Sequence, residues 1–249
     1  MQNEHDLGTD VIAATGIVRV EQLLRGLGAG DGEFLHQVIG DLLFAAPDMF
    51  RPMVALLVAE ALGAGDDERV IRFAGAVQIV YAAMHTHQQV RLAHEPAAGN
   101  LVVLAGDYLY AQAAVIAAGL EHLPVMALLS EAIKEICRQG LEEPLGGSVN
   151  EAAKPEPPAG ALGLFELSAA GAALLAGAPT AAIAAAGRYG SDLDALTSAR
   201  TPEAARQSIS LGAIEALTPL PAGAARWQLE RLTTMVSVPA WLAETLHGG

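Results

Sequence analysis

The sequence predicts an all-α protein, a bundle of long antiparallel helices, and two features carry that prediction. Hydrophobic residues make up 52% of the 249 positions but aromatic residues only 4%, and Ala, Leu and Gly dominate. Strands favour aromatic and β-branched side chains, so this composition disfavours a β-sandwich. Apolar residues also recur at helical spacing almost throughout, and proline, glycine and aspartate interrupt them where helices would end.

In the first half of the chain, proline, glycine and aspartate mark the helix boundaries. Pro47 cannot continue a helix, and Asp48 can cap the one that follows. The acidic run 66–68 comes after a glycine-rich break, where negative side chains satisfy free N–H groups and complement the helix dipole. Another break lies at Ala-Ala-Gly-Asn, residues 97–100. These boundaries predict helices over residues 10–27, 33–45, 49–62, 66–90, 101–120 and 123–140.

The second half begins with a segment rich in proline and glycine, residues 142–160, which is predicted to be a surface loop. Thr201 is predicted to be an N-cap, with Pro202 in the first turn of the helix that follows. No fixed-period repeat and no clear boundary divides the chain, so a single domain over residues 1–249 is predicted. The remaining predicted helices cover residues 161–177, 179–187, 222–236 and 239–247.

The charge and the cysteine content exclude several classes of protein. A formal net charge of −14 repels phosphate backbones, and no basic stripe supports nucleic-acid binding. The single cysteine, Cys137, cannot form an internal disulfide, which is typical of a reducing compartment. The acidic N-terminus does not resemble a signal peptide. A cytoplasmic location is therefore predicted.

Two apolar stretches raise the question of a membrane span. Residues 101–120 contain Asp107, and residues 167–187 are uncharged but consist mostly of Ala and Gly, with Pro179 inside. A span requires about 20 strongly apolar residues, and alanine drives insertion only weakly. Both stretches are therefore interpreted as buried helices of a soluble domain, and no transmembrane segment is expected.

Four segments, in the same order, resemble the isoprenyl (trans-polyprenyl) diphosphate synthase family. Residues 50–63, FRPMVALLVAEALG, are similar to its Arg-Pro helix, and residues 74–85, AGAVQIVYAAMH, to the helix before its first aspartate-rich motif. Residues 104–113, LAGDYLYAQA, match a third helix of the family and are the most specific of the four. Residues 164–177 are similar to the helix after the family's Lys-Thr motif. The resemblance implies an isoprenoid-synthase-like helical bundle.

The chain departs from the family where metal would bind. Family members carry Asp-Asp-x-x-Asp on a helix, and these carboxylates hold Mg²⁺ against the substrate diphosphate. The Leu-His pair before that motif resembles residues 84–85, which places the first aspartate motif at Thr86, His87 and Val90. None of these three is a carboxylate. The arginines that normally follow also lack counterparts beyond Arg91.

The other chemical motifs of the family are absent as well. The second aspartate motif is replaced by a segment with Asp192 and Asp194, which lie about 200° apart around a helix and cannot share a metal there. The lysine of the Lys-Thr motif is missing near residues 160–161, and the Gly-Gly-Lys before Arg-Pro has become residues 46–48. We therefore predict no catalytic, cofactor-binding or metal-binding residues, and a chain that is inactive by itself.

The polar residues around the lost motif admit other interpretations. His85, His87 and His94 suggest zinc, but the first two point to nearly opposite sides of a helix and the third is two turns away. Polar residues facing a vestigial cleft or a subunit contact are the favoured interpretation. Gln88 and Gln89 are expected to form hydrogen bonds near that cleft, and an orienting role toward a neutral ligand stays open.

Three further residues outside these motifs carry chemistry of their own. Arg51 resembles the arginine of the Arg-Pro helix and is a candidate for a residual anion contact, although pairing with a carboxylate is the favoured interpretation. Asp107 lies in an apolar helix and needs a partner there. Cys137 has no nucleophile motif around it and is expected to be a buried small apolar residue.

The resemblance implies a non-catalytic small subunit of a heteromeric polyprenyl diphosphate synthase. A catalytic partner would carry both aspartate motifs and the Mg²⁺ in a heterodimer or heterotetramer, and isolated chains could form homodimers. The family dimerises through the helices that match residues 101–120 and 123–140. The alternatives are a metal-independent, lipid-binding homodimer and an enzyme with a rewired site around His85, His87 and Glu95. The candidate residues of the dimer helix are Gly106, Asp107, Ala111, Ala114 and Ala118.

Overall fold

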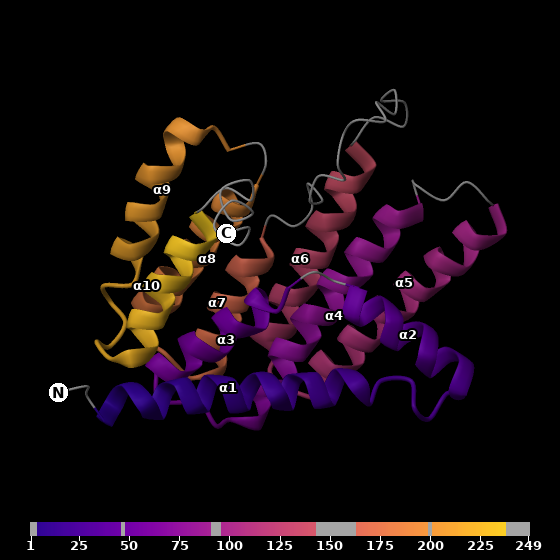
Figure 1. Cartoon of the computed structure of the whole chain (residues 1–249), viewed down its shortest axis with the longest axis horizontal. Coiled ribbons are helices and arrows are strands. Elements are labelled where there is room, and N and C mark those ends of the chain that lie inside the picture. Colours follow the sequence, from indigo (N-terminus) through magenta and orange to yellow (C-terminus); the bar gives the residue numbers. More distant parts are fainter. Residues whose placement is uncertain (1–3, 46–47, 91–95, 143–162, 199–200, 238–249) are drawn as a thin grey trace, which may run out of the picture.

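The computed structural model describes residues 4–45, 48–90, 96–142, 163–198 and 201–237, and these residues form helices and short turns with no strand (Figure 1). The all-α prediction is confirmed. The helices are α1 (Glu4–Arg25), α2 (Glu33–Ala45), α3 (Phe50–Ala61), α4 (Glu68–Val90), α5 (Pro96–Ala118), α6 (Leu123–Glu142), α7 (Leu164–Leu175), α8 (Thr180–Thr197), α9 (Glu203–Ala216) and α10 (Ala224–Ser237).

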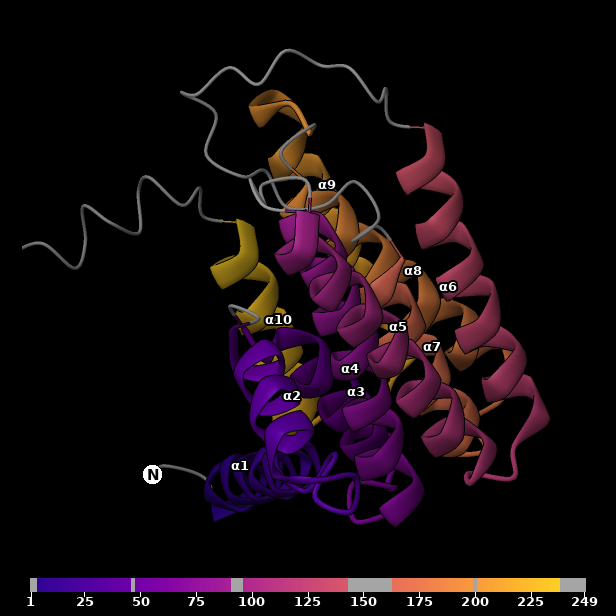
Figure 2. The same ribbon diagram turned by 90° about the vertical axis from the view of Figure 1, so that its right-hand side faces the viewer.

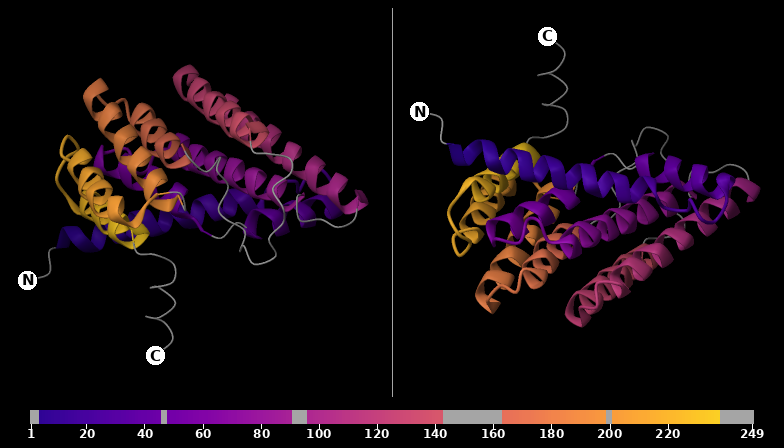
Figure 3. Two further views of the ribbon diagram at one scale, coloured as in Figure 1. Left: turned by 90° about the horizontal axis from the view of Figure 1, so that it is seen from above. Right: turned by 90° about the horizontal axis from the view of Figure 1, so that it is seen from below.

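The helices form a bundle around α3, α4 and α7. In Figure 1, α1 runs along the base and most of the other helices rise from it. Helices α5 and α6 form one outer edge of the bundle, as the view turned by 90° shows (Figure 2). Helices α8, α9 and α10 form the other side, and the views from above and below show the separation of these two groups (Figure 3).

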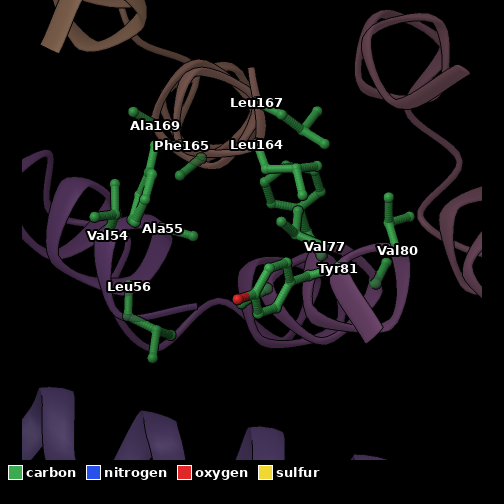
Figure 4. Close-up of a cluster of buried hydrophobic side chains, with 14 of the residues drawn as sticks. Val54, Ala55, Leu56, Val77, Val80, Tyr81, Leu164, Phe165, Leu167 and Ala169 are labelled. Atoms are coloured by element: carbon green, nitrogen blue, oxygen red, sulfur yellow. The ribbon is translucent and has the colours of Figure 1, made fainter. Parts of the chain in front are cut away.

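The apolar core lies where α3, α4 and α7 meet. Val54 and Ala55 of α3 face Val77 of α4 and Leu164 and Phe165 of α7 (Figure 4). Ten of the twelve residues of α7 are buried, which explains why its sequence is apolar around the whole helix. The core therefore has α7 at its centre rather than on its surface.

Most predicted elements are confirmed, with corrections at their ends. Helix α2 has the predicted bounds, whereas α1 and α5 each begin earlier than predicted. Helix α8 continues to Thr197 instead of ending at residue 187. Thr201 is not an N-cap: its hydroxyl donates to the carbonyl oxygen of Ala195 over 2.6 Å, and Pro202 takes the cap position. The predicted loop beyond Glu142 and the predicted helix over 239–247 lie outside the described residues.

Helix α5 differs from the expectation of a buried helix. Residues Asn100–Ala118 are long and apolar enough to cross a membrane, yet only 33% of the apolar window is buried in the fold. Helices α2 and α3 are long and apolar enough to cross a membrane only when they are taken together, as a pair bent by 76°. A core helix of a soluble protein meets the same criterion, so length and composition do not decide the matter. Most of this apolar window instead lies exposed on the surface of the chain.

A buried tyrosine joins α8 to α10. The Tyr189 hydroxyl donates to the carbonyl oxygen of Leu229 over 2.9 Å, and burial raises the pKa of the phenol. Tyr189→Phe is expected to lower the free energy of unfolding by about 1 kcal/mol, because one buried hydrogen bond is lost while Thr233 Oγ1 still donates to the same carbonyl oxygen over 3.0 Å. Tyr108→Phe is the control, since its bond to Asp31 is exposed and its loss should cost less than about 0.5 kcal/mol. Urea unfolding followed by circular dichroism measures both; equal costs would contradict this account.

Candidate functional site

Arg51 lies at the centre of a buried polar cluster between α3, α4 and α7. The residue is 3% exposed, and its Nη1 donates to Asp48 Oδ1 over 3.1 Å. Its guanidinium carbon lies 3.7 Å from the centre of the Tyr81 ring and 4.6 Å from that of Phe165. Electron-rich ring faces attract a cation, and the carboxylate supplies the opposite charge. The cluster thus neutralises an arginine that would be costly to bury alone.

Asp48 is held in this cluster by a backbone N–H at the start of α3 and by a side chain of α4. Its Oδ1 also accepts the N–H of Phe50 over 3.1 Å at the start of α3, and its carbonyl oxygen accepts from Nε2 of Gln78 over 2.9 Å. Burial raises the pKa of Tyr81, with Arg51 opposing and Asp48 adding to that shift. Two buried side-chain atoms of the described residues have no hydrogen-bond partner, and both belong to this cluster: Arg51 Nε and Gln78 Oε1.

Asp194 of α8 caps the start of α7. Its Oδ1 accepts the N–H of Phe165 over 3.1 Å, and its Oδ2 accepts the N–H of Glu166 over 3.0 Å. The N-cap of α7 is Gly163, which has a φ of 96° and no side chain with which to cap the helix. Helix α7 therefore takes its cap from a neighbouring helix. Burial raises the pKa of Asp194 to about 7, and the backbone donors and Arg51 oppose that shift.

Asp192 and Asp194 of α8 face different neighbouring helices. Asp192 lies beside α9, where a Cβ on Gly212 would be 3.6 Å from its Oδ2, while Asp194 faces α7. Burial raises the pKa of Asp192, with Arg188 opposing the shift. The two carboxylates therefore face different neighbouring helices.

The end of α4 carries the residues at which the resemblance places the first aspartate motif. The Thr86 hydroxyl donates to the carbonyl oxygen of Ala82 over 2.8 Å, so it is turned back onto its own helix. Nε2 of His87 lies 3.2 Å from the carbonyl oxygen of Val103 and 3.3 Å from Oδ1 of Asp107 on α5. Val90 is the last residue of α4, and its side chain lies outside the described part. Thr86 and His87 are thus engaged within the bundle.

Other candidate ligands do not form a metal site in the part of the chain that the structure describes. No group of three His, Cys, Asp or Glu residues there is arranged to hold an ion. His94, Glu95 and the side chains of Gln88 and Gln89 lie outside that part. Asp67 accepts the N–H of Arg69 over 2.8 Å at the start of α4, which is the capping role that the sequence predicts.

The five candidate residues of the dimer helix divide between two faces of α5. Gly106 faces α4, since a Cβ there would lie 2.4 Å from Nε2 of His87, so its small size serves packing inside the chain. The other four are exposed, and large apolar side chains are exposed around them. The exposed candidates are Asp107, Ala111, Ala114 and Ala118, and the large apolar residues are Leu101, Val103, Leu104, Val115 and, on α6, Leu123.

Several outcomes differ from the sequence analysis. Cys137 is exposed and not buried as predicted, because α6 turns Leu129 and Ile136 inward and Cys137 follows them on the outer side. Nothing in the sequence around Gln78 predicts its contact with the Arg51 cluster. The sequence indicates Asp194 only as a candidate metal ligand. A signal existed for its true role, because Gly163 leaves the apolar helix after it without a capping side chain.

Comparison of sequences finds limited similarity to known proteins. No family model matches the chain. A prenyl transferase from Cyanidium caldarium is 24% identical over 141 residues, which are 52% of this chain and 44% of that protein. The match thus spans less than half the length of this curated relative.

Comparison of structures is more extensive. A decaprenyl diphosphate synthase from Rhodobacter capsulatus has a TM-score of 0.75 at 20% identity, covering 92% of this chain and 98% of that one. A polyprenyl synthase from Caulobacter crescentus, complexed with calcium and isoprenyl diphosphate, has a TM-score of 0.75 at 19% identity, with coverages of 93% and 98%. The geranyl diphosphate synthase small subunit from Antirrhinum majus has a TM-score of 0.69 at 19% identity, with coverages of 92% and 99%. The chain therefore has the all-helical fold of the isoprenyl diphosphate synthases.

Proposed function

We propose that this chain is the non-catalytic small subunit of a heteromeric polyprenyl diphosphate synthase. The observation that carries the proposal is the end of α4. Where the resemblance places metal-binding carboxylates, Thr86 bonds its own helix and His87 packs on α5. Magnesium prefers several hard oxygen ligands, which these two side chains do not supply. The catalytic partner would carry the Mg²⁺ and elongate the prenyl chain.

Structural similarity supports the same proposal. The fold is shared with synthases and also with a chain that is described as a small subunit, the one from Antirrhinum majus. A small subunit needs the scaffold and a docking surface but not the chemistry. A cytoplasmic complex, heterodimeric or heterotetrameric, is part of the proposal.

The outer side of α5 is the docking surface that we assign to the partner. Leu104 and Val115 are each 66% exposed, and Ala111 and Ala114 between them let another helix approach closely. Contiguous apolar surface of this kind marks interaction sites in soluble proteins. The resemblance implies that subunits meet through this helix, so the surface and the proposed assembly agree.

Purification of the tagged chain from its native host tests the proposal directly. The expected result is a stoichiometric partner with two intact Asp-Asp-x-x-Asp motifs, and Mg²⁺-dependent prenyl transfer by the complex but not by the isolated chain. Prenyl transfer by the isolated chain would overturn the proposal. Recovery of a homodimer with a bound isoprenoid would favour the metal-independent lipid-binding alternative.

A charge on the α5 surface should break the complex. Val115→Glu is expected to weaken partner binding by about tenfold or more, because a carboxylate would be buried in an apolar contact. Leu211→Glu on α9 is the matched control, since Leu211 is 63% exposed and lies away from α5. Titration of labelled partner measures both affinities, and thermal unfolding should be unchanged in either variant. Equal affinities of the two variants for the partner would mean that the partner binds a surface other than α5.

A further inference from the structure

His87 of α4 forms a pair with Asp107 of α5 at the edge of the docking surface. Its Nε2 lies 3.3 Å from Asp107 Oδ1 and 3.2 Å from the carbonyl oxygen of Val103. Both neighbours accept hydrogen bonds, so Nε2 carries a proton and Nδ1 is the atom at which the ring can take up a second one. A Cβ at Gly106 would lie 2.4 Å from Nε2, so the missing side chain there lets the ring approach α5.

Asp107 lies in the surface that the partner would cover. Its side chain is 63% exposed, and Ala111 and Ala114 follow it four and seven residues later on the same face of α5. Leu104, one turn before Asp107, is exposed as well. A helix that packs on these alanines would therefore exclude water from the Asp107 carboxylate. An ionised carboxylate is costly to bury unless a cation pairs with it.

The other titratable groups around His87 do not supply that cation. The ring of Tyr110 on α5 has its centre 5.5 Å from that of the imidazole, and burial raises the pKa of its phenol, so this group stays neutral between pH 6 and pH 8. Cys137 of α6 acts on Tyr110 and adds to that shift. His85 lies two residues before His87, about 200° away around α4. Within the described part of the chain, the ion pair that Asp107 can form is with His87.

We propose that partner binding at the α5 surface is coupled to the uptake of one proton by the His87–Asp107 pair. The proton comes from the solvent and binds Nδ1 of His87, and no other covalent bond forms or breaks. Loss of water strengthens the attraction between the imidazolium and the carboxylate, and histidine changes its charge between about pH 5 and pH 8. A complex that holds one proton more than its separated subunits becomes tighter as the pH falls. This inference rests on the proposed function, because it concerns the regulation of the same surface.

Titration of the labelled partner at pH 6, 7 and 8 tests the coupling. The native chain is expected to bind the partner about fivefold more tightly at pH 6 than at pH 8. His87→Gln keeps a side-chain N–H donor but takes up no proton, so its affinity should change less with pH. Asp107→Asn removes the charge that docking would bury. It should bind the partner more tightly than the native chain at pH 8 and show the same reduced dependence on pH.

His36→Gln is the matched control. His36 also contacts a backbone carbonyl oxygen, that of Leu27 over 2.7 Å, but this contact lies at the turn between α1 and α2. Its pH profile should equal that of the native chain, and the comparison also removes the contribution of titrating groups on the partner. Identical profiles of the native chain and His87→Gln would overturn the proposal.

Two further outcomes separate this inference from the proposed function. Weaker binding of Asp107→Asn than of the native chain at pH 8 would overturn the inference alone, because it would mean that the partner supplies its own cation to the carboxylate. Failure of the native chain to bind any partner between pH 6 and pH 8 would contradict the proposed function and, with it, the proton coupling.

Discussion

Gly190→Ala is expected to lower the free energy of unfolding by about 3 kcal/mol or more. A Cβ at residue 190 would lie 2.3 Å from the carbonyl oxygen of Phe165 and 2.5 Å from Cα of Glu166. These are backbone atoms of a buried helix, so no side chain can move aside and α8 must shift away from α7. Urea unfolding followed by circular dichroism measures the loss as a lower midpoint.

Gly187→Ala is the matched control for this variant. It lies on the same helix, and its nearest neighbour would be the Cβ of Ala170 at 3.8 Å, an ordinary contact. Because alanine favours a helix interior over glycine, this variant should keep the native stability or gain up to about 1 kcal/mol. Similar losses in both variants would show that α7 and α8 are not in the close contact described here.

Glycines also explain why α8 extends beyond its predicted end at residue 187. The pattern of α2, with apolar residues at helical spacing and clear breaks on both sides, was sufficient to predict its bounds. In α8, the helix was predicted to end at Gly187, whereas it continues through Gly190, and the missing side chain of Gly190 allows the helix to touch α7. Local propensity does not reveal such a need, because it depends on a partner that is distant in sequence.

The candidate site was predictable to a similar extent. Pairing of Arg51 with a carboxylate and the separation of Asp192 from Asp194 followed from residue types and spacing. The burial of Arg51 between aromatic rings did not, because Tyr81 and Phe165 come from two other helices. Nor could helical periodicity decide which side of α5 would be covered, since that depends on how many helices pack around it.

Gly190 and Asp194 act together at the start of α7. They lie one helical turn apart on α8, so they share a face. The missing side chain of Gly190 allows α8 to approach the backbone of Phe165 and Glu166, and the Asp194 carboxylate then reaches their N–H groups. Asp194→Ala is therefore expected to cost about 2–4 kcal/mol, because two backbone donors lose their acceptor and the side chain leaves a small cavity.

The charge of Asp194 should make the stability of the protein depend on pH. Burial raises its pKa from 3.8 in the unfolded chain to about 7 in the fold, so folding favours the protonated form. Its stabilising contribution is complete below about pH 4 and is lost as the pH rises through 7, by about 4 kcal/mol at most. Asp194→Asn has no carboxyl group to ionise and should lack this loss, although its amide nitrogen cannot accept the second backbone N–H and lowers the stability by an amount that does not depend on pH.

Urea unfolding of the native chain and of Asp194→Asn between pH 4 and pH 8 measures the difference between their pH profiles. The variant should be less stable than the native chain at pH 4, gain on it up to about pH 7 and gain little more toward pH 8. Asp192→Asn is the control, and its effect should be smaller because Asp192 is only partly buried. If the native chain instead gains on Asp194→Asn as the pH rises, the backbone N–H groups and Arg51 outweigh burial and the cap of α7 is an ionised carboxylate.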